Sequence, residues 1–178
     1  MDEVTRGAIK LELKHGDIAA QNDMDAVVNA ANAQLSGGGG VDGALHRAAG
    51  PKLKKASEPK GPIEPGEAVI TQGFNLPNKY VIHCLGPVYG QDETEDELLA
   101  NCYKNALKLA EENGIESIAF PAISCGAFGY PMRKAAEVAF KTVNEESVHF
   151  AKVKLIRFVL FGEEAMEIHK EVMAEVFG

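Results

Sequence analysis

The spacing of hydrophobic residues changes several times along the chain, and each change marks an expected element. Residues 9–13 alternate between apolar and charged side chains, which predicts a half-buried strand that ends at His15-Gly16-Asp17. A second, short apolar strand is expected at residues 25–29, where it closes on an asparagine. Beyond four consecutive glycines, apolar residues recur at spacings of three and four, which predicts a short helix from near Asp42 to Gly50-Pro51.

The second half of the chain continues this alternation of strands and helices. Residues 66–73 and 79–86 are two apolar runs separated by FNLPN, which favours a hairpin of antiparallel strands. Thr94-Glu95-Asp96-Glu97 has the sequence of a capping box and predicts a long helix that ends at Asn113-Gly114. The remaining elements expected are a strand in SIAFPAI, a helix at about 131–146 with Pro131 in its first turn, a strand in VKLIRFVLFG and a last helix in EEAMEIHKEVMAEVF.

Interleaved strands and helices predict a three-layer α/β domain, and the hairpin makes its sheet mixed. The 178 residues fit one domain, and no internal repeat or linker divides them. Hydrophobic residues make up 46% of the chain and charged residues 25%, as in ordinary globular proteins. We therefore expect a single domain over residues 1–178.

Charge and cysteine content narrow the range of partners and compartments. The formal charge is −8 and the longest basic run is Lys54-Lys55, which argues against binding to duplex nucleic acid. Three cysteines without CxxC spacing indicate reduced thiols, and no apolar stretch is long enough to span a membrane. We expect a soluble cytoplasmic protein with no membrane partner. The histidines show no metal-ligand spacing, so no metal is expected.

The segment LSGGGGVDGALHRAAG, residues 35–50, is the first candidate for chemistry, because ordering four glycines costs much backbone entropy. A dinucleotide fingerprint would need these glycines at the tip of the preceding strand, but eight residues intervene. A phosphate-binding P-loop would need Lys-Ser/Thr where Ala44-Leu45 stand, and a flexible linker would not run directly into a helix. The segment is better interpreted as a loop that offers backbone N–H groups to an anion at a helix N-terminus.

A second loop of this kind, residues 124–130, also joins a strand to a helix. Two such loops at the carboxyl ends of strands would hold a diphosphate from both sides. Asp42 and His46 lie four residues apart, hence on one face of the helix. Each has a structural alternative, because Asp42 suits a helix cap and His46 a packed helical position. Asn29 and Asn32 would likewise serve either the site or their own backbone.

Five motifs follow one another along the chain: GDI at 16–18, DAVVNAAN at 25–32, GGGGVDGALHRAAG at 37–50, YVIHCLGPVYG at 80–90 and FPAISCGAFGYP at 120–131. In this order they resemble the macro domain family, and most closely its MacroD-type branch. The resemblance covers nearly the whole chain. It implies an α/β/α sandwich with a mixed sheet of about six strands and a pocket for ADP-ribose.

The same resemblance assigns roles to individual residues. Asp42 would orient or deprotonate a water, Asn32 would bond the distal ribose, and His46 would support them as the third member of the catalytic set. Substrate binding would involve Asp17 and Ile18 at the adenine, Asn29 beneath the pocket, Gly39, Gly40 and Val41 in the first loop, and Ser124, Cys125, Gly126, Ala127 and Phe128 in the second.

Some residues depart from the family pattern or suggest another chemistry. Phe128 stands where the family often has Tyr, and Cys125 where Thr or Ala is commoner. Ile123-Ser124-Cys125-Gly126 faintly resembles a nucleophile elbow, but Ala122 replaces its first glycine. His83, within an apolar strand, is interpreted as a core histidine with satisfied hydrogen bonds.

The resemblance implies a hydrolase that cleaves esters at the distal ribose of ADP-ribose by attack of water and without a catalytic cofactor. Its substrates would be O-acetyl-ADP-ribose and mono-ADP-ribosylated proteins modified on Asp or Glu side chains. Two alternatives stay open. One is a non-catalytic module that binds ADP-ribose, and the other is a phosphatase of ADP-ribose 1″-phosphate.

Overall fold

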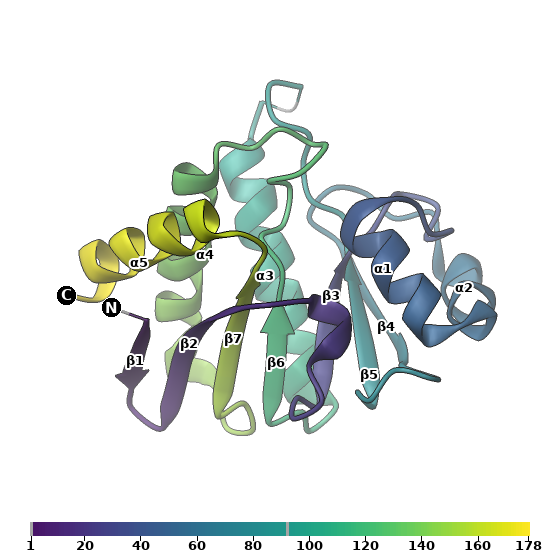
Figure 1. Ribbon diagram of the computed structural model, residues 1–178, viewed down its shortest axis with the longest axis horizontal. Coiled ribbons are helices and arrows are strands. Elements are labelled where there is room, and N and C mark those ends of the chain that lie inside the picture. The colour runs from purple at the N-terminus through teal and green to yellow at the C-terminus, as the bar shows by residue number, and fades with distance from the viewer. Residues whose placement is uncertain (1, 92) are drawn as a thin grey trace.

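The computed structural model describes residues 2–91 and 93–178, which form seven strands and five α-helices (Figure 1). The strands are β1 (Glu3–Arg6), β2 (Ile9–His15), β3 (Ala26–Ala30), β4 (Ala68–Gln72), β5 (Tyr80–Cys84), β6 (Ser117–Phe120) and β7 (Leu155–Leu160). The helices are α1 (Gly40–Ala49), α2 (Pro51–Ser57), α3 (Glu95–Glu112), α4 (Met132–Glu146) and α5 (Glu163–Phe177), with 3-10 turns η1 (Ile18–Ala20), η2 (Glu58–Lys60) and η3 (Ser147–His149).

All seven strands form one mixed sheet in the order β1-β2-β7-β6-β3-β5-β4. The five central strands are parallel, whereas β1 and β4 run antiparallel at the two edges. The hairpin predicted around FNLPN is the β4–β5 pair. The expected count of about six strands was one short, because β1 has only four residues and one apolar side chain, Val4.

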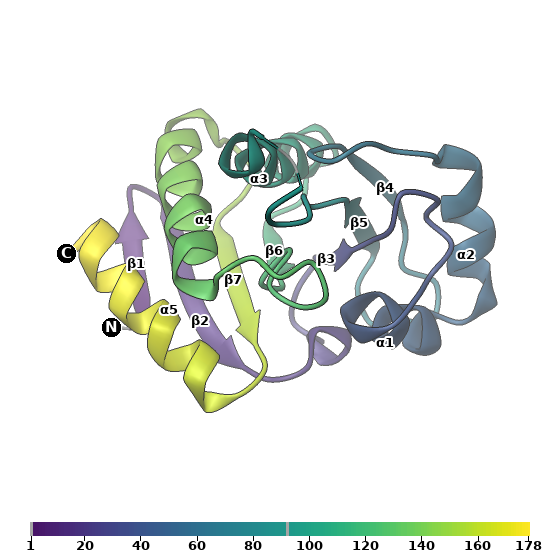
Figure 2. The ribbon, with the colours of Figure 1, turned by 90° about the horizontal axis from the view of Figure 1, so that it is seen from above.

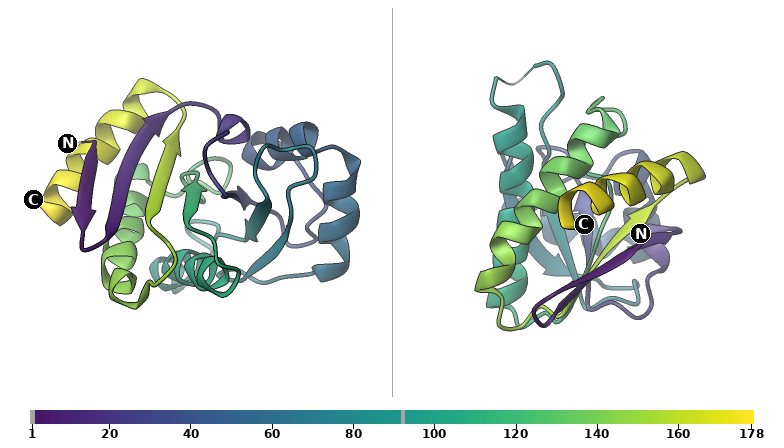
Figure 3. Two further views of the ribbon diagram at one scale, coloured as in Figure 1. Left: turned by 90° about the horizontal axis from the view of Figure 1, so that it is seen from below. Right: turned by 90° about the vertical axis from the view of Figure 1, so that its left-hand side faces the viewer.

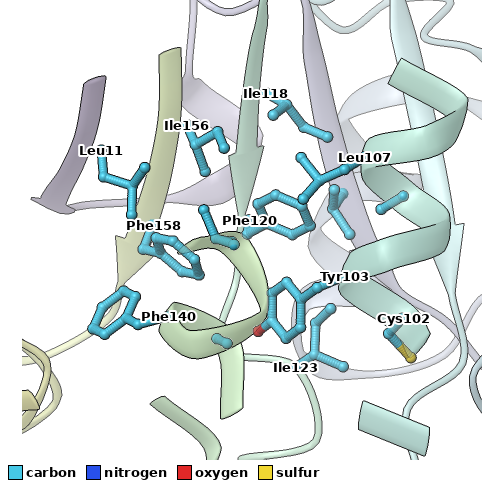
Figure 4. Packing of buried hydrophobic residues seen from close by; sticks show 14 of the residues in the cluster. Leu11, Cys102, Tyr103, Leu107, Ile118, Phe120, Ile123, Phe140, Ile156 and Phe158 are labelled. Carbon is cyan, nitrogen blue, oxygen red and sulfur yellow. The ribbon is translucent and has the colours of Figure 1, made fainter. Parts of the chain in front are cut away.

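Helices cover both faces of the sheet, so the α/β/α sandwich is confirmed (Figure 3). One face packs against α3, α4 and α5 in the larger hydrophobic core. The aromatic side chains of Tyr103, Phe120, Phe140 and Phe158 meet at its centre, with the rings of Tyr103 and Phe120 5.0 Å apart (Figure 4). The other face packs against η1, α1 and α2 through a smaller cluster that includes Leu45 and Val81.

The structure differs from the sequence predictions at three places. The helix α1 ends before Gly50-Pro51 as predicted, but the unpredicted helix α2 follows at once, because Gly50 turns the chain at a positive φ of 86° and Pro51 opens a new helix. The capping box at Thr94 is not formed; instead Glu95 Oε2 accepts a hydrogen bond of 2.8 Å from the N–H of Gly90. Pro131 precedes the first turn of α4 and does not belong to it.

This topology brings two chain segments together at the carboxyl ends of two central strands. The parallel neighbours β3 and β6 end on the same side, so the loops that follow them, residues 31–39 and 121–131, leave the sheet together (Figure 2). Phe128 of the second loop packs with Ala31 and Leu35 of the first. Within the described ranges, no helix has both the length and the apolar character needed to cross a membrane.

Candidate active site

The first loop ends in a helix N-terminus whose donors are unused. The N-cap residue of α1 is Gly39, and the N–H of Gly43 is the first to bond back, to the carbonyl of Gly39 at 3.1 Å. Among the described residues, no protein acceptor bonds the N–H groups of Gly39, Gly40 and Val41. Free N–H groups at a helix N-terminus form a binding site for an anion.

The second loop offers a similar set of donors. Ser124 adopts a positive φ of 67°, and its carbonyl accepts a hydrogen bond of 2.9 Å from the N–H of Tyr130. In the described part of the chain, the N–H groups of Gly126, Ala127 and Phe128 have no protein acceptor. The two loops therefore present free N–H groups after the carboxyl ends of two neighbouring parallel strands, an arrangement suited to a diphosphate.

Two glycines allow this close approach. A Cβ on Gly43 would overlap the carbonyl oxygen of Gly38, so only glycine lets the first loop lie against α1. A Cβ on Gly86 would overlap the hydroxyl of Ser124, so only glycine admits this side chain beneath the second loop. Gly86 was absent from the predicted site, although it lies inside the motif YVIHCLGPVYG.

Asp42 lies in the first turn of α1, close to Gly38 of the first loop, and is 6% exposed. It is the third residue of α1 and makes no cap, since Gly39 holds the N-cap position. Its Oδ1 accepts a hydrogen bond of 2.8 Å from Asn29 Nδ2 and lies 3.4 Å from His46 Nε2. Burial raises the pKa of the Asp42 carboxyl, while the bond from Asn29 and the proximity of His46 act in the opposite direction. A carboxylate with a raised pKa is a better proton acceptor.

Asn29 connects Asp42 to a buried histidine. Its Nδ2 lies 3.1 Å from His83 Nδ1, and His83 Nε2 lies 3.0 Å from Thr71 Oγ1. His83 is therefore a core histidine with satisfied hydrogen bonds, as expected, and burial lowers its pKa to about 3. Sequence reasoning did not find its link to Asn29, which depends on the register of β3 and β5.

Asn32 and His46 shape the first loop from below. The Asn32 side chain donates to the carbonyl of Gly37 at 2.9 Å and accepts from the N–H of Ser36 at 3.2 Å. The local alternative considered for Asn32 is thus observed. The His46 ring packs beneath Gly37, where a Cβ would lie 3.4 Å from the ring.

Asp17 lies at a separate position, beside the turn η1. Its Oδ1 accepts a hydrogen bond of 2.9 Å from the N–H of Ala19, and its carboxylate is exposed. Ile18 is buried in the smaller hydrophobic cluster, where it packs with Leu45 of α1. The side chain of Gln21 donates to the carbonyl of Asp17 at 2.8 Å and steadies the turn.

The geometry disfavours a side-chain nucleophile in the second loop. The Ser124 hydroxyl is buried without a hydrogen-bond partner among the described residues, so no base contacts it there. Burial raises the pKa of the Cys125 thiol to about 11, and its N–H is bonded to the carbonyl of Ala122. Within the described ranges, no three His, Cys, Asp or Glu side chains are grouped to hold a metal. A cavity of about 330 Å³ lies elsewhere, at the edge strand β4, and none of the predicted site residues lines it.

Comparison with known proteins places this site in a family. Residues 28–139 match the profile of the Macro domain, a stretch that includes both loops. The chain belongs to the macro domain family. One relative is the O-acetyl-ADP-ribose deacetylase of Citrobacter koseri, 47% identical over 171 residues that span 93% of this chain and 96% of the relative.

Solved macro domains share the whole architecture. The macrodomain of Oceanobacillus iheyensis with ADP matches at a TM-score of 0.94 and 39% identity, over 98% of this chain and 95% of that one. A Trypanosoma brucei macrodomain in complex with ADP-ribose matches at 0.83 and 36% identity, over 90% of this chain and 68% of that one. In this macro domain, Asn29, Asp42 and His46 are in direct contact beneath the glycine loop, and Asp17 stands apart from them.

Proposed function

We propose that this macro domain binds ADP-ribose and hydrolyses esters at its distal ribose. The observation that carries the proposal is the buried Asp42 carboxylate, held directly beneath two loops with free N–H groups. The loops supply the donors for a diphosphate, and the carboxylate supplies a proton acceptor at its distal end. The C. koseri relative is named for the same reaction, the deacetylation of O-acetyl-ADP-ribose.

Binding divides along the length of the ligand. The free oxygen of the Asp17 carboxylate accepts a hydrogen bond from the adenine amino group, and the buried Ile18 supports the turn beneath the ring. The N–H groups of the two loops bond the diphosphate, and the half-buried ring of Phe128 lies against the distal ribose. Ser124 and Cys125 shape the second loop. The net charge of −8 opposes an anionic ligand only weakly, because distant charges are screened at physiological ionic strength.

Hydrolysis uses water as the nucleophile. Asp42 accepts a proton from a bound water while the oxygen of this water attacks the carbonyl carbon of the ester. The bond between this carbon and the ribose oxygen then breaks, and the ribose oxygen takes up a proton. An acid and a free ribose hydroxyl are released. Asn32 orients the distal ribose, and His46, 3.4 Å from Asp42, supports the carboxylate.

The same chemistry extends to proteins that carry ADP-ribose on Asp or Glu, since that linkage is also an ester at the distal ribose. We propose mono-ADP-ribosylated proteins as the second class of substrate and partner. The three free cysteines fit a reducing compartment such as the cytoplasm.

Product analysis on the purified protein tests the proposal and separates it from its alternatives. With O-acetyl-ADP-ribose in ¹⁸O-labelled water, attack at the carbonyl carbon places the label in acetate. A protein modified on glutamate should lose its ADP-ribose under the same conditions. Binding of ADP-ribose by calorimetry without any turnover would indicate a reader module, and release of phosphate only from ADP-ribose 1″-phosphate would indicate a phosphatase.

A further inference from the structure

A chain of four buried polar side chains runs from Asp42 to the edge strand β4. Asp42 contacts Asn29, Asn29 contacts His83, and His83 contacts Thr71. The chain passes through α1, β3, β5 and β4 in turn, and each of its members is at most 6% exposed. Thr71 also donates to the carbonyl of Gln72 at 3.1 Å.

Each hydrogen bond in this chain has a defined direction. A carboxylate only accepts, so the amide of Asn29 must turn its NH₂ group toward Asp42. The same nitrogen faces His83 Nδ1, which must therefore be the unprotonated nitrogen of the ring. The proton of the neutral ring then resides on Nε2 and is donated to Thr71 Oγ1, whose own hydrogen is used by the carbonyl of Gln72.

In the part of the chain that the structure describes, no hydrogen bond to the carbonyl oxygen of the Asn29 side chain fixes the orientation of the amide. Asn29 Oδ1 is buried and has no hydrogen-bond partner among the described residues. An unpaired buried acceptor is destabilising, so the amide is held in place by its partners on the NH₂ side. Reversal would place an oxygen against both the Asp42 carboxylate and the lone pair of His83.

We propose that His83 and Thr71 are positioning residues that fix the direction of the Asn29 amide and so keep an N–H against the Asp42 carboxylate. Thr71 stabilises the ring tautomer with its proton on Nε2, and this tautomer acts together with the Asp42 carboxylate to fix the direction of the amide. The inference rests on the proposed function for its meaning, because the group being positioned is the proton acceptor of that reaction. Neither residue is expected to touch the substrate.

The charges around the chain are consistent with this arrangement. The titratable groups that bear on it are His46 from α1, beside Asp42, and Lys60 from η2. The charges of His46 and then of Lys60 add to the effect of burial in lowering the pKa of His83. A protonated His83 would present an N–H to the NH₂ of Asn29. The neutral ring, favoured by burial, is the form that the amide needs.

The first test uses the native protein without substrate. Long-range ¹H–¹⁵N NMR of the imidazole of His83 should show a proton on Nε2 and none on Nδ1 between pH 5 and 8, on the order of the range in which an ordinary histidine titrates. A ring protonated on Nδ1 would overturn the proposal. This measurement does not depend on turnover. An inactive protein would refute the proposed function, whereas the protonation of the His83 ring would still decide this inference.

The second test is Thr71→Val, which removes the hydroxyl while keeping the shape of the side chain. Without the hydroxyl, no acceptor holds the proton of the His83 ring on Nε2, and the Asn29 amide reverses in part. The pKa of Asp42 should then rise by about one unit, a tenfold shift in its protonation equilibrium. Carboxyl ¹³C NMR measures this pKa. If the protein is active, the acid limb of its pH–rate profile should move by the same amount, while the dissociation constant for ADP-ribose changes less than about threefold.

Thr142→Val is the matched control, because Thr142 is another buried threonine, bonded within α4 to the carbonyl of Val138. It should leave the tautomer of His83 and the pKa of Asp42 unchanged. His83→Phe removes the acceptor itself and should raise the pKa of Asp42 at least as much as Thr71→Val. An Asp42 pKa that is equal in the native protein and in folded Thr71→Val would refute the positioning role.

Discussion

Two clusters of polar side chains, one around the buried Arg157 and one around the buried Asp42, handle charge in opposite ways. Around Arg157 every charge has a partner of opposite sign. Its guanidinium donates to Glu12 at 2.8 Å and to both oxygens of Asp23 at 2.7 Å, and it also bonds Gln21 at 3.0 Å. The hydrogen bond from Arg157 lowers the pKa of Asp23 to about 2. Because each charge in it is paired, we call the group of Arg157, Glu12, Asp23 and Gln21 the closed cluster.

Around Asp42 the negative charge is incompletely paired. Its carboxylate is held by a neutral amide and lies 3.4 Å from a histidine, and burial raises its pKa. One buried oxygen of the cluster, Asn29 Oδ1, has no partner in the described part of the chain. The comparison teaches that a paired charge fastens the fold, while an incompletely paired one keeps a lone pair available for a reaction.

The strongest break in the comparison is expected from Asp42→Asn. The change keeps the shape and removes the basic oxygen, so turnover should fall by about 10²–10⁴-fold, the usual contribution of a positioned general base. Affinity for ADP-ribose and the melting temperature should change little. Hydrolysis rates and calorimetry on the one variant measure both quantities.

Two other aspartates serve as controls for this change. Asp23→Asn, in the closed cluster, and Asp2→Asn, on the surface, should leave turnover at the native level. A rate of Asp42→Asn within a few-fold of native would exclude its role as the proton acceptor.

Arg157→Met should have the opposite signature. It leaves the carboxylates of Glu12 and Asp23 without their buried partner, so the free energy of unfolding should fall while turnover at saturating substrate is kept. The loss should be about 3 kcal/mol, the low end for a buried pair, because the Asp23 side chain is 59% exposed and water replaces part of the lost interaction. Chemical denaturation measures the loss. Arg133→Met is the matched control, since Arg133 pairs with Glu171 and Glu175 on the surface, and its loss should cost less than about 1 kcal/mol. Equal losses in both variants would mean that the closed cluster does not fasten the fold.

Asp17→Ala sharpens the comparison, because Asp17 belongs to neither cluster but its backbone carbonyl is tied through Gln21 to Arg157. Removing the carboxylate should weaken ADP-ribose by about 1.5–3 kcal/mol, the range for a hydrogen bond to a charged group. The rate at saturating substrate should be unchanged. Equal affinity of the native protein for the inosine analogue would count against adenine recognition by Asp17.

The last prediction concerns how the stability of the two clusters depends on pH, an effect that is spread over several pH units. The folded pKa of His83 is lowered to about 3 from 6.5, so the unfolded chain takes up a proton that the folded protein refuses. Stability should therefore be complete above pH 6.5 and decline as the pH falls toward 3, by about 1.4 kcal/mol per unit for one proton.

The contribution of Asp23, whose folded pKa is also lowered, should persist down to pH 3.8 and be lost as the pH falls through about 2. Thermal melts between these limits separate the two contributions. A His83→Phe variant with an unchanged slope between pH 6.5 and 4 would contradict the assignment to His83.

The sequence predicted most of the fold, since side-chain periodicity is set by local geometry. It also predicted the two loops, because glycines at helix starts have a direct backbone meaning. The short edge strand β1 and the helix α2 were missed, since Val4 alone gives no period and Gly50-Pro51 marks both the end of one helix and the start of the next.

The buried links of the site were beyond reach for a different reason. Asn29 and His83 are register partners in β3 and β5, and Glu12 and Arg157 are register partners in β2 and β7. These residues are far apart in the chain, and a shift of one residue in either strand would turn each side chain to the other face. A single sequence states which strands exist but leaves their register undetermined.

The edge strand β1 also has a practical consequence for experiments. Arg6 donates to the carbonyl of Phe177 at 2.7 Å, so β1 and the end of α5 lie side by side at the edge of the sheet farthest from β4 (Figure 1). A dye, an affinity tag or a solid support attached at either end would therefore point away from α1 and its loop. Both chain ends are therefore suitable positions for a label in the binding experiments described above.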